Sequence, residues 1–199
     1  MTSILKADTI QDAAGNNIIN EAGDVITIGA SGDTINIASG ATNNLGIAVV
    51  DQWYLTSAKT DSSDITANLA RVAQSGFGRL GTGMTESSGI FTFPSTGIWR
   101  VEFCGAWQIA AGDNASVSTY LTLNNSSYAA IAHAGVSNQA ASGTAAGVDN
   151  GYVASLIDVT DVANVKVKFT TASVASGTQL NGAADPLGTN FIFTRLGST

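Results

Sequence analysis

The alternation of large apolar and polar residues predicts a chain built from short β-strands. The clearest strand spans residues 98–107, where Trp99, Val101, Phe103 and Trp107 fall on one face and mainly polar residues fall on the other. A period of two with bulky groups on one side is typical of a strand that covers a hydrophobic core. We therefore expect this segment to lie at the centre of the fold.

Comparable segments recur along the chain between turns rich in Gly, Ser and Asn. They cover residues 47–55, 90–93, 117–123, 128–133, 151–159, 165–169 and 191–195. This spacing predicts an all-β sandwich of the jelly-roll type. Residues 151–159 are apolar on both faces, which predicts a strand buried in the sandwich or at a subunit contact.

Two other segments are expected to lack strands. Residues 65–73 carry apolar groups at helical spacing and predict a short helical turn, and the Ala-, Ser- and Gly-rich residues 134–150 predict a long loop.

The first 44 residues contain no aromatic residue and cannot bury enough surface to fold alone as a compact unit. An Ile-x-Ile pair nevertheless recurs nine residues later, and the four side chains are Ile26, Ile28, Ile35 and Ile37. Two short repeats are too few for a single-chain solenoid, so three chains wound about one axis would supply the missing layers. A flexible linker is the alternative. The expected organisation is segment 1–25, a stem over 26–45 and a head over 46–199.

Composition limits the partners. The formal net charge of −7 excludes nucleic acid, because phosphate binding needs clustered cations. No apolar run is long enough to span a membrane. A single cysteine excludes an intrachain disulfide framework, and the N-terminus lacks the pattern of a secretory signal. We expect synthesis and folding in a cytosol.

The head resembles the trimeric jelly roll of complement-type and tumour-necrosis-factor-like proteins. The matching residues are Gly89, Phe91, Phe93, Pro94, Gly97, Trp99, Val101 and Phe103. The resemblance implies a homotrimer whose C-terminal strand, rich in aromatic residues, lies near the threefold axis. It also implies a head core that includes Phe91, Phe93, Trp99, Val101 and Phe103.

The N-terminus is similar to the first residues of many bacteriophage virion proteins. The matching residues are Leu5, Lys6, Asp8, Thr9, Ile10, Gln11, Gly15, Asn16, Ile18 and Ile19. The resemblance implies that residues 1–25 attach the protein to capsid or tail proteins of a virion, with Leu5, Ile10, Ile18 and Ile19 as anchoring residues.

Catalytic chemistry has little support in this sequence. His133 is the only histidine, lies among small apolar residues and is expected to pack in the fold or at an interface, and Cys104 is expected to pack. The carboxylates at Asp61 and Asp64, at Asp149, and at Asp158 and Asp161 lack calcium-loop spacing, although calcium remains an alternative to turn chemistry. We expect no enzyme activity and no cofactor.

The expected function is that of a trimeric phage structural protein that displays jelly-roll heads as a capsid decoration or head fibre, located on the virion and released by lysis. The alternatives are a tail fibre or receptor-binding protein, a complement-like bacterial binding module, and a glycan-cleaving enzyme. Expected loops at 112–116, 134–150 and 174–189 are rich in hydrogen-bonding residues. They are candidates for binding a neutral host-surface carbohydrate.

Overall fold

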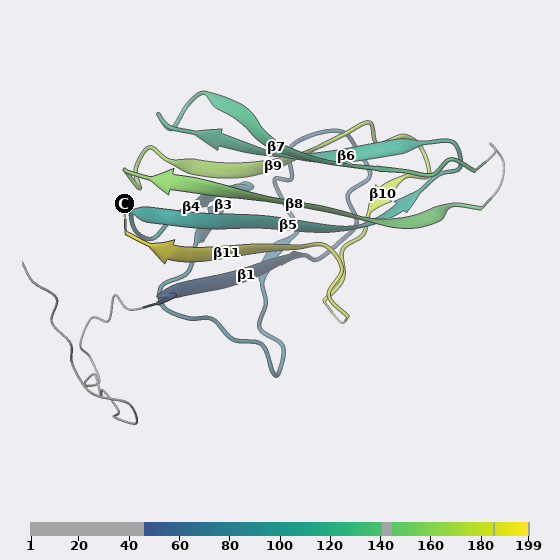
Figure 1. The fold of residues 1–199 in the computed structure, drawn as a ribbon. Coiled ribbons are helices and arrows are strands. Elements are labelled where there is room, and N and C mark those ends of the chain that lie inside the picture. The colour runs from purple at the N-terminus through teal and green to yellow at the C-terminus, as the bar shows by residue number, and fades with distance from the viewer. Residues whose placement is uncertain (1–45, 141–144, 185, 199) are drawn as a thin grey trace, which may run out of the picture. The chain divides into compact units, whose positions relative to one another are not determined.

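The computed structural model describes residues 46–140, 145–184 and 186–198, which fold into a sandwich of two antiparallel sheets (Figure 1). The expected anchoring segment 1–25 and stem 26–45 lie outside the described residues. The described residues form no helix, and therefore none long and apolar enough to cross a membrane. The all-β jelly-roll prediction is confirmed for the head.

The first layer is a six-stranded sheet. Its strands are β1 (Val49–Leu55), β2 (Leu69–Arg71), β5 (Gly97–Ile109), β8 (Gly147–Val159), β10 (Gln179–Leu180) and β11 (Asn190–Gly197). They run in the order β8–β5–β11–β1–β2, with β10 paired to the last residues of β5. The central strand β5 is thus bonded along both edges, as its sequence pattern predicts.

The second layer is a five-stranded sheet. Its strands are β3 (Thr85–Ser87), β4 (Ile90–Thr92), β6 (Asn114–Thr122), β7 (Tyr128–Ser137) and β9 (Lys166–Ala172). They run in the order β3–β4–β9–β6–β7, so first and last halves of the chain interleave in both layers. This interleaving is characteristic of a jelly roll.

Aromatic side chains fill the space between the sheets. Phe103 of β5 and Phe191 of β11 face Phe169 of β9, with ring centroids 4.7–5.9 Å apart in these three pairs. Phe91 joins the same cluster, 4.9 Å from Phe193. Along β5 every second side chain is buried, because alternate residues of a strand point to opposite faces of its sheet.

Both described termini lie at one end of the sandwich. Val49, at the start of β1, pairs with Arg195 near the end of β11, and Gly97 pairs with Val159. We call this the near end, and Figure 1 shows the chain entering and leaving there. The turn at residues 110–113 and the segment at 173–178 lie at the opposite, far end. The far end therefore faces away from the point where the preceding residues join the head.

The prediction of a helical turn at residues 65–73 is wrong. Ile65 is buried in the core, and Leu69–Arg71 form β2, in which Leu69 pairs with Leu55. Asn68 adopts a left-handed conformation with φ 59°, which no α-helix can include. The helical spacing of the apolar residues is coincidental, because β-sheet pairing determines the conformation.

The prediction of a long loop at residues 134–150 is also wrong at both ends. β7 continues to Ser137 and β8 begins at Gly147. Small residues have weak strand propensity, but here β7 is paired to β6 and β8 to β5, and Ala134 and Val136 are buried. Tertiary pairing thus overrides local preference.

Candidate interaction surface

The outer face of the six-stranded sheet carries exposed apolar side chains. On β8, Tyr152 is 55% and Leu156 is 69% exposed, and on β11 Leu196 is 42% exposed. Leu156 and Leu196 line a mainly apolar, open hollow of about 400 Å³ together with Arg100 and Ala154. A run of large apolar groups on one face is typical of an interaction surface.

β-Strand alternation produces this face. Gly151, Ile157 and Val159 of β8 turn inward, so Tyr152, Ala154 and Leu156 must turn outward. The prediction that both faces of residues 151–159 are apolar is correct as to residue type. One face is buried in the sandwich and the other is exposed in the single chain.

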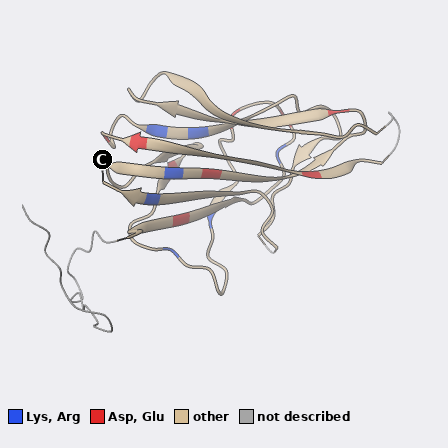
Figure 2. Ribbon diagram, in the orientation of Figure 1, with Lys and Arg blue, Asp and Glu red and all other residues tan. Residues whose placement is uncertain are grey.

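Two charged groups on this face, Arg100 and Glu102, neutralise each other, whereas Asp158 of β8 also lies outward and has no salt bridge among the described residues. Arg100 Nη2 donates to Tyr152 Oη (2.9 Å) and pairs with Glu102 Oε1 (2.9 Å), while Tyr152 Oη donates to Glu102 (2.6 Å). The hydrogen bond to Tyr152 and the nearby Glu102 carboxylate raise the pKa of Arg100. Figure 2 shows how sparse charges are along β5, β8 and β11. The face therefore combines apolar area with a balanced ion pair.

The outer face of the five-stranded sheet has a different character. Ser116 and Ser118 on β6, His133 on β7 and Lys166 and Lys168 on β9 occupy its outward positions. Lys168 Nζ lies 4.7 Å from the ring centroid of Tyr128 and bonds the Asp64 carboxylate at 2.6 Å. This face is more polar than that of the six-stranded sheet, although Ile131 of β7 is 40% exposed.

The structure places the sequence-predicted core residues between the sheets. Phe91, Phe93, Trp99, Val101 and Phe103 are all at most 2% exposed. The predicted anchoring residues Leu5, Ile10, Ile18 and Ile19 lie outside the described residues. The stem residues Ile26, Ile28, Ile35 and Ile37 lie outside them as well.

His133 does not pack inside the single chain, which leaves the expected interface position untested. Its side chain is exposed on β7, and its Nδ1 lies 3.2 Å from Ser118 Oγ. An outward position on β7 follows from the burial of its neighbour Ala134. Cys104 is a half-buried free thiol on the outer face of β5, opposite Tyr152.

Of the carboxylates considered for calcium, all but Asp158 have a partner among the described residues. Asp61 accepts from Lys59 and Ser63, and Asp161 accepts from the Ala163 N–H and the Asn164 side chain. Asp149 accepts the N–H of Asn150. In the described part of the chain, no three His, Cys, Asp or Glu side chains lie close enough together to hold a metal ion.

Asp64 joins the connection between β1 and β2 to β9 of the other sheet. Its carboxylate accepts from Lys168 Nζ on β9 and from Thr170 Oγ1. Partial burial opposes ionisation, but the hydrogen bonds from Lys168 and Thr170 outweigh it, so the pKa of Asp64 lies below its usual value. The hydrogen bond from Lys59 similarly lowers the pKa of Asp61.

A lowered pKa predicts loss of stability in acid. The unfolded chain binds a proton near pH 4 and the folded chain only below that, so the contribution of Asp64 is complete above about pH 4 and is lost as pH falls through the folded pKa. We expect Asp64→Asn to cost about 0.5–1 kcal/mol at pH 7, because solvent screens this half-exposed pair. Urea unfolding of both proteins at pH 7 and pH 3 checks this. The difference between them should shrink in acid, and a constant difference would contradict the assignment.

A buried ionic cluster was not anticipated from the sequence. Asp51 is fully buried on β1 and accepts from Arg71 Nε (2.8 Å), Trp53 Nε1 (2.9 Å) and the Met84 N–H (2.8 Å). The signal for this cluster in the sequence is Asp51, the one charged residue among the apolar residues of this strand. Because its carboxylate is fully bonded, this cluster serves to hold the 72–84 connection against β1.

No protein-family model and no curated protein matches the chain. Among solved structures, murine APRIL at pH 5.0 is similar over 74% of this chain and 98% of its own, with 14% identity and a TM-score of 0.55. Eiger TNF from S. frugiperda is similar over 77% of this chain and 95% of its own, with 10% identity and a TM-score of 0.57. The chain therefore has the jelly-roll fold of tumour-necrosis-factor-like proteins.

Proposed function

We propose that this chain is a non-enzymatic structural protein that forms a homotrimer, is attached to a bacteriophage particle by its N-terminal segment and displays the jelly-roll heads. The observation that carries the proposal is the apolar outer face of β5, β8 and β11, which no described residue covers. Exposed faces of this kind are stabilised by association.

A second copy of the same chain is the occupant that fits this face best. Arg100 and Glu102 already form a balanced pair, so Asp158 at the near end is the one outward charge of β5 and β8 that remains to repel an identical surface. The Ile-x-Ile repeat at residues 26–37 independently favours three chains. A head-to-tail contact between identical chains closes into a ring when its rotation is threefold.

The resemblance of residues 5–19 to phage virion proteins supports attachment through the N-terminus. Within the head, the described chain begins at the near end, next to the start of β1 and the end of β11. The proposed location is the virion, with phage capsid or tail proteins as the partners of residues 1–25.

Two measurements test this proposal together. Sedimentation equilibrium of the full chain should give about three times the 20.1 kDa chain mass at micromolar concentration. A chain beginning at Asp24 should keep the trimeric mass but fail to bind particles that lack the protein. A single-chain mass would refute the trimer, and equal binding by both chains would refute the N-terminal attachment.

A further inference from the structure

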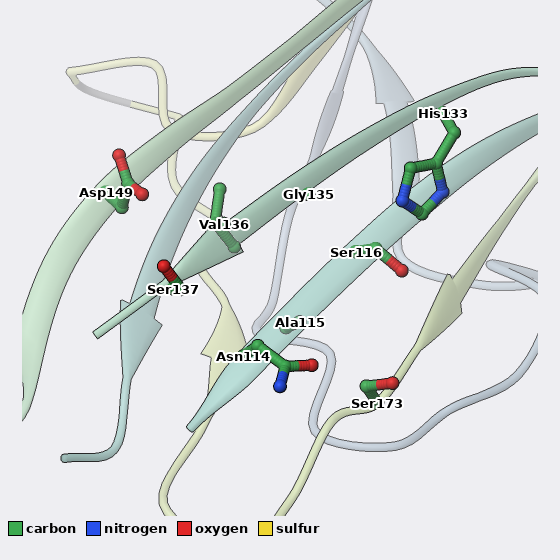
Figure 3. A pocket seen from close by; sticks show the side chains of 9 residues that line it. All are labelled: Asn114, Ala115, Ser116, His133, Gly135, Val136, Ser137, Asp149 and Ser173. Atoms are coloured by element: carbon green, nitrogen blue, oxygen red, sulfur yellow. The ribbon is translucent and has the colours of Figure 1, made fainter. Parts of the chain in front are cut away.

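A second, polar hollow opens at the far end of the five-stranded sheet (Figure 3). It has a volume of about 400 Å³ and is lined by Asn114, Ser116, His133, Gly135, Ser137 and Ser173, among others. These residues come from the consecutive strands β6 and β7 and from Ser173, which directly follows β9. All of them belong to the five-stranded layer, and Asp149 of β8 is the one lining residue from the six-stranded sheet.

The polar side chains of the hollow are available to a ligand. Within the described residues, no hydrogen bond involves the side chain of Asn114, Ser116, Ser137 or Ser173. Neighbouring polar groups at the same end are paired, since Thr178 donates to Asp113 and Asn138 donates to the Ile109 carbonyl. Hydroxyl and amide groups both donate and accept hydrogen bonds. The hollow thus gathers unused groups of both kinds.

Gly135 keeps the hollow open. Its φ lies outside the left-handed region, so backbone conformation does not require glycine there. A Cβ at this position would meet only His133 Nε2, at 3.6 Å, which is ordinary contact. The absence of a side chain therefore creates space rather than relieving strain.

His133 is oriented toward the same space. Its Nδ1 is held by Ser118 Oγ, and its Nε2 is the atom nearest to the Gly135 Cβ position. Figure 3 shows the ring, the Asn114 amide and the Ser116 and Ser173 hydroxyls around one opening. Ser118 acts as a positioning residue for the imidazole.

The charge of the lining selects the ligand class. No Lys or Arg lines the hollow, and its one carboxylate, Asp149, already accepts a backbone N–H. An anion would find no cation to pair with, and the lining offers little apolar area for a hydrophobic ligand. A neutral molecule with several adjacent hydroxyl groups matches the donors and acceptors present.

We propose that this hollow binds a neutral sugar unit. The inference adds a ligand to the proposed function and rests on that function in one step only. A trimer would carry three such sites, so it would bind a repeating polymer more tightly than one site binds its sugar unit. The site itself belongs to a single chain. His133 Nε2, the Asn114 amide and the Ser116 and Ser173 hydroxyls contact the sugar hydroxyls.

The only histidine supplies a selective probe. The ¹H–¹³C resonance of the His133 ring is recorded at pH 7.5 while the methyl glycosides of mannose, galactose, glucose and N-acetylglucosamine are added in turn to the full chain. We expect at least one of them to move the resonance saturably, with a Kd of about 1–10 mM. Glycerol and the anionic methyl galacturonide, at equal concentration, should not.

Two variants locate the binding. Gly135→Val fills the hollow without backbone strain, and Asn114→Ala removes an exposed amide that no described residue bonds. Each should weaken binding at least about tenfold with an unchanged melting temperature. Failure of all four glycosides, an equal response to methyl galacturonide, or unchanged binding by both variants would overturn the proposal. Sedimentation mass is independent of these readings, so a trimer that binds no sugar would refute this inference alone.

Discussion

Replacing Leu156 by lysine should dissociate the trimer into single folded chains. Leu156 is 69% exposed in the single chain, so the substitution costs the isolated head little. In the proposed trimer the new ammonium would be desolvated on an apolar face, directly opposite the like charge of Arg100. An unpaired buried charge costs about 3–5 kcal/mol, which is enough to abolish association at micromolar concentration.

Leu123 provides the matched control. It is 67% exposed but follows β6 of the other sheet, away from the apolar face. Leu123→Lys changes the net charge equally and should leave the mass at three chains by sedimentation equilibrium. If both variants stay trimeric, the outer face of β8 is not the contact surface, and the proposed assembly must use another.

Replacing Phe103 by alanine should cost about 3–5 kcal/mol of unfolding free energy. The side chain is fully buried on β5, with its ring centroid 5.5 Å from that of Phe191 and 5.9 Å from that of Phe169. Its removal loses the transfer free energy and leaves a cavity that the rigid sheets close only in part.

Urea unfolding at one fixed protein concentration measures this cost, because association contributes to apparent stability. Phe77→Ala is the control, since Phe77 is 49% exposed on a connection and its loss should change stability by no more than about 0.5 kcal/mol. Equal effects of the two substitutions would contradict the position of Phe103 in the core.

The central strand could be predicted from the sequence because its signal is local. Trp99, Val101 and Phe103 alternate with Arg100 and Glu102, and the register of β5 within the sheet preserves that alternation. The extensions of β7 and β8 through Ala, Gly and Ser could not be predicted this way. Their strand structure depends on partners in β6 and β5, which no local pattern encodes.

The polar hollow shows the same limit more strongly. Two of the expected recognition segments contribute to it, through Asn114 and Ser116 in one and Gly135 and Ser137 in the other, but as paired strands rather than loops. The registers Ser116↔Gly135 and Ser116↔Ala172 bring them beside Ser173. Only the pairing register, and not sequence spacing, reveals that these residues are neighbours.

The pairing of β1 with β11 has a consequence for biosynthesis. Val49 and Arg195 are paired neighbours in the sheet although almost the whole head separates them in sequence. On the ribosome, β1 and β5 cannot pair with β11 until β11 has emerged, so their facing backbone edges stay unpaired until then. Contacts of such long range also slow folding to the millisecond-to-second regime. The nascent head is therefore most exposed to aggregation just before the eight residues of β11 emerge.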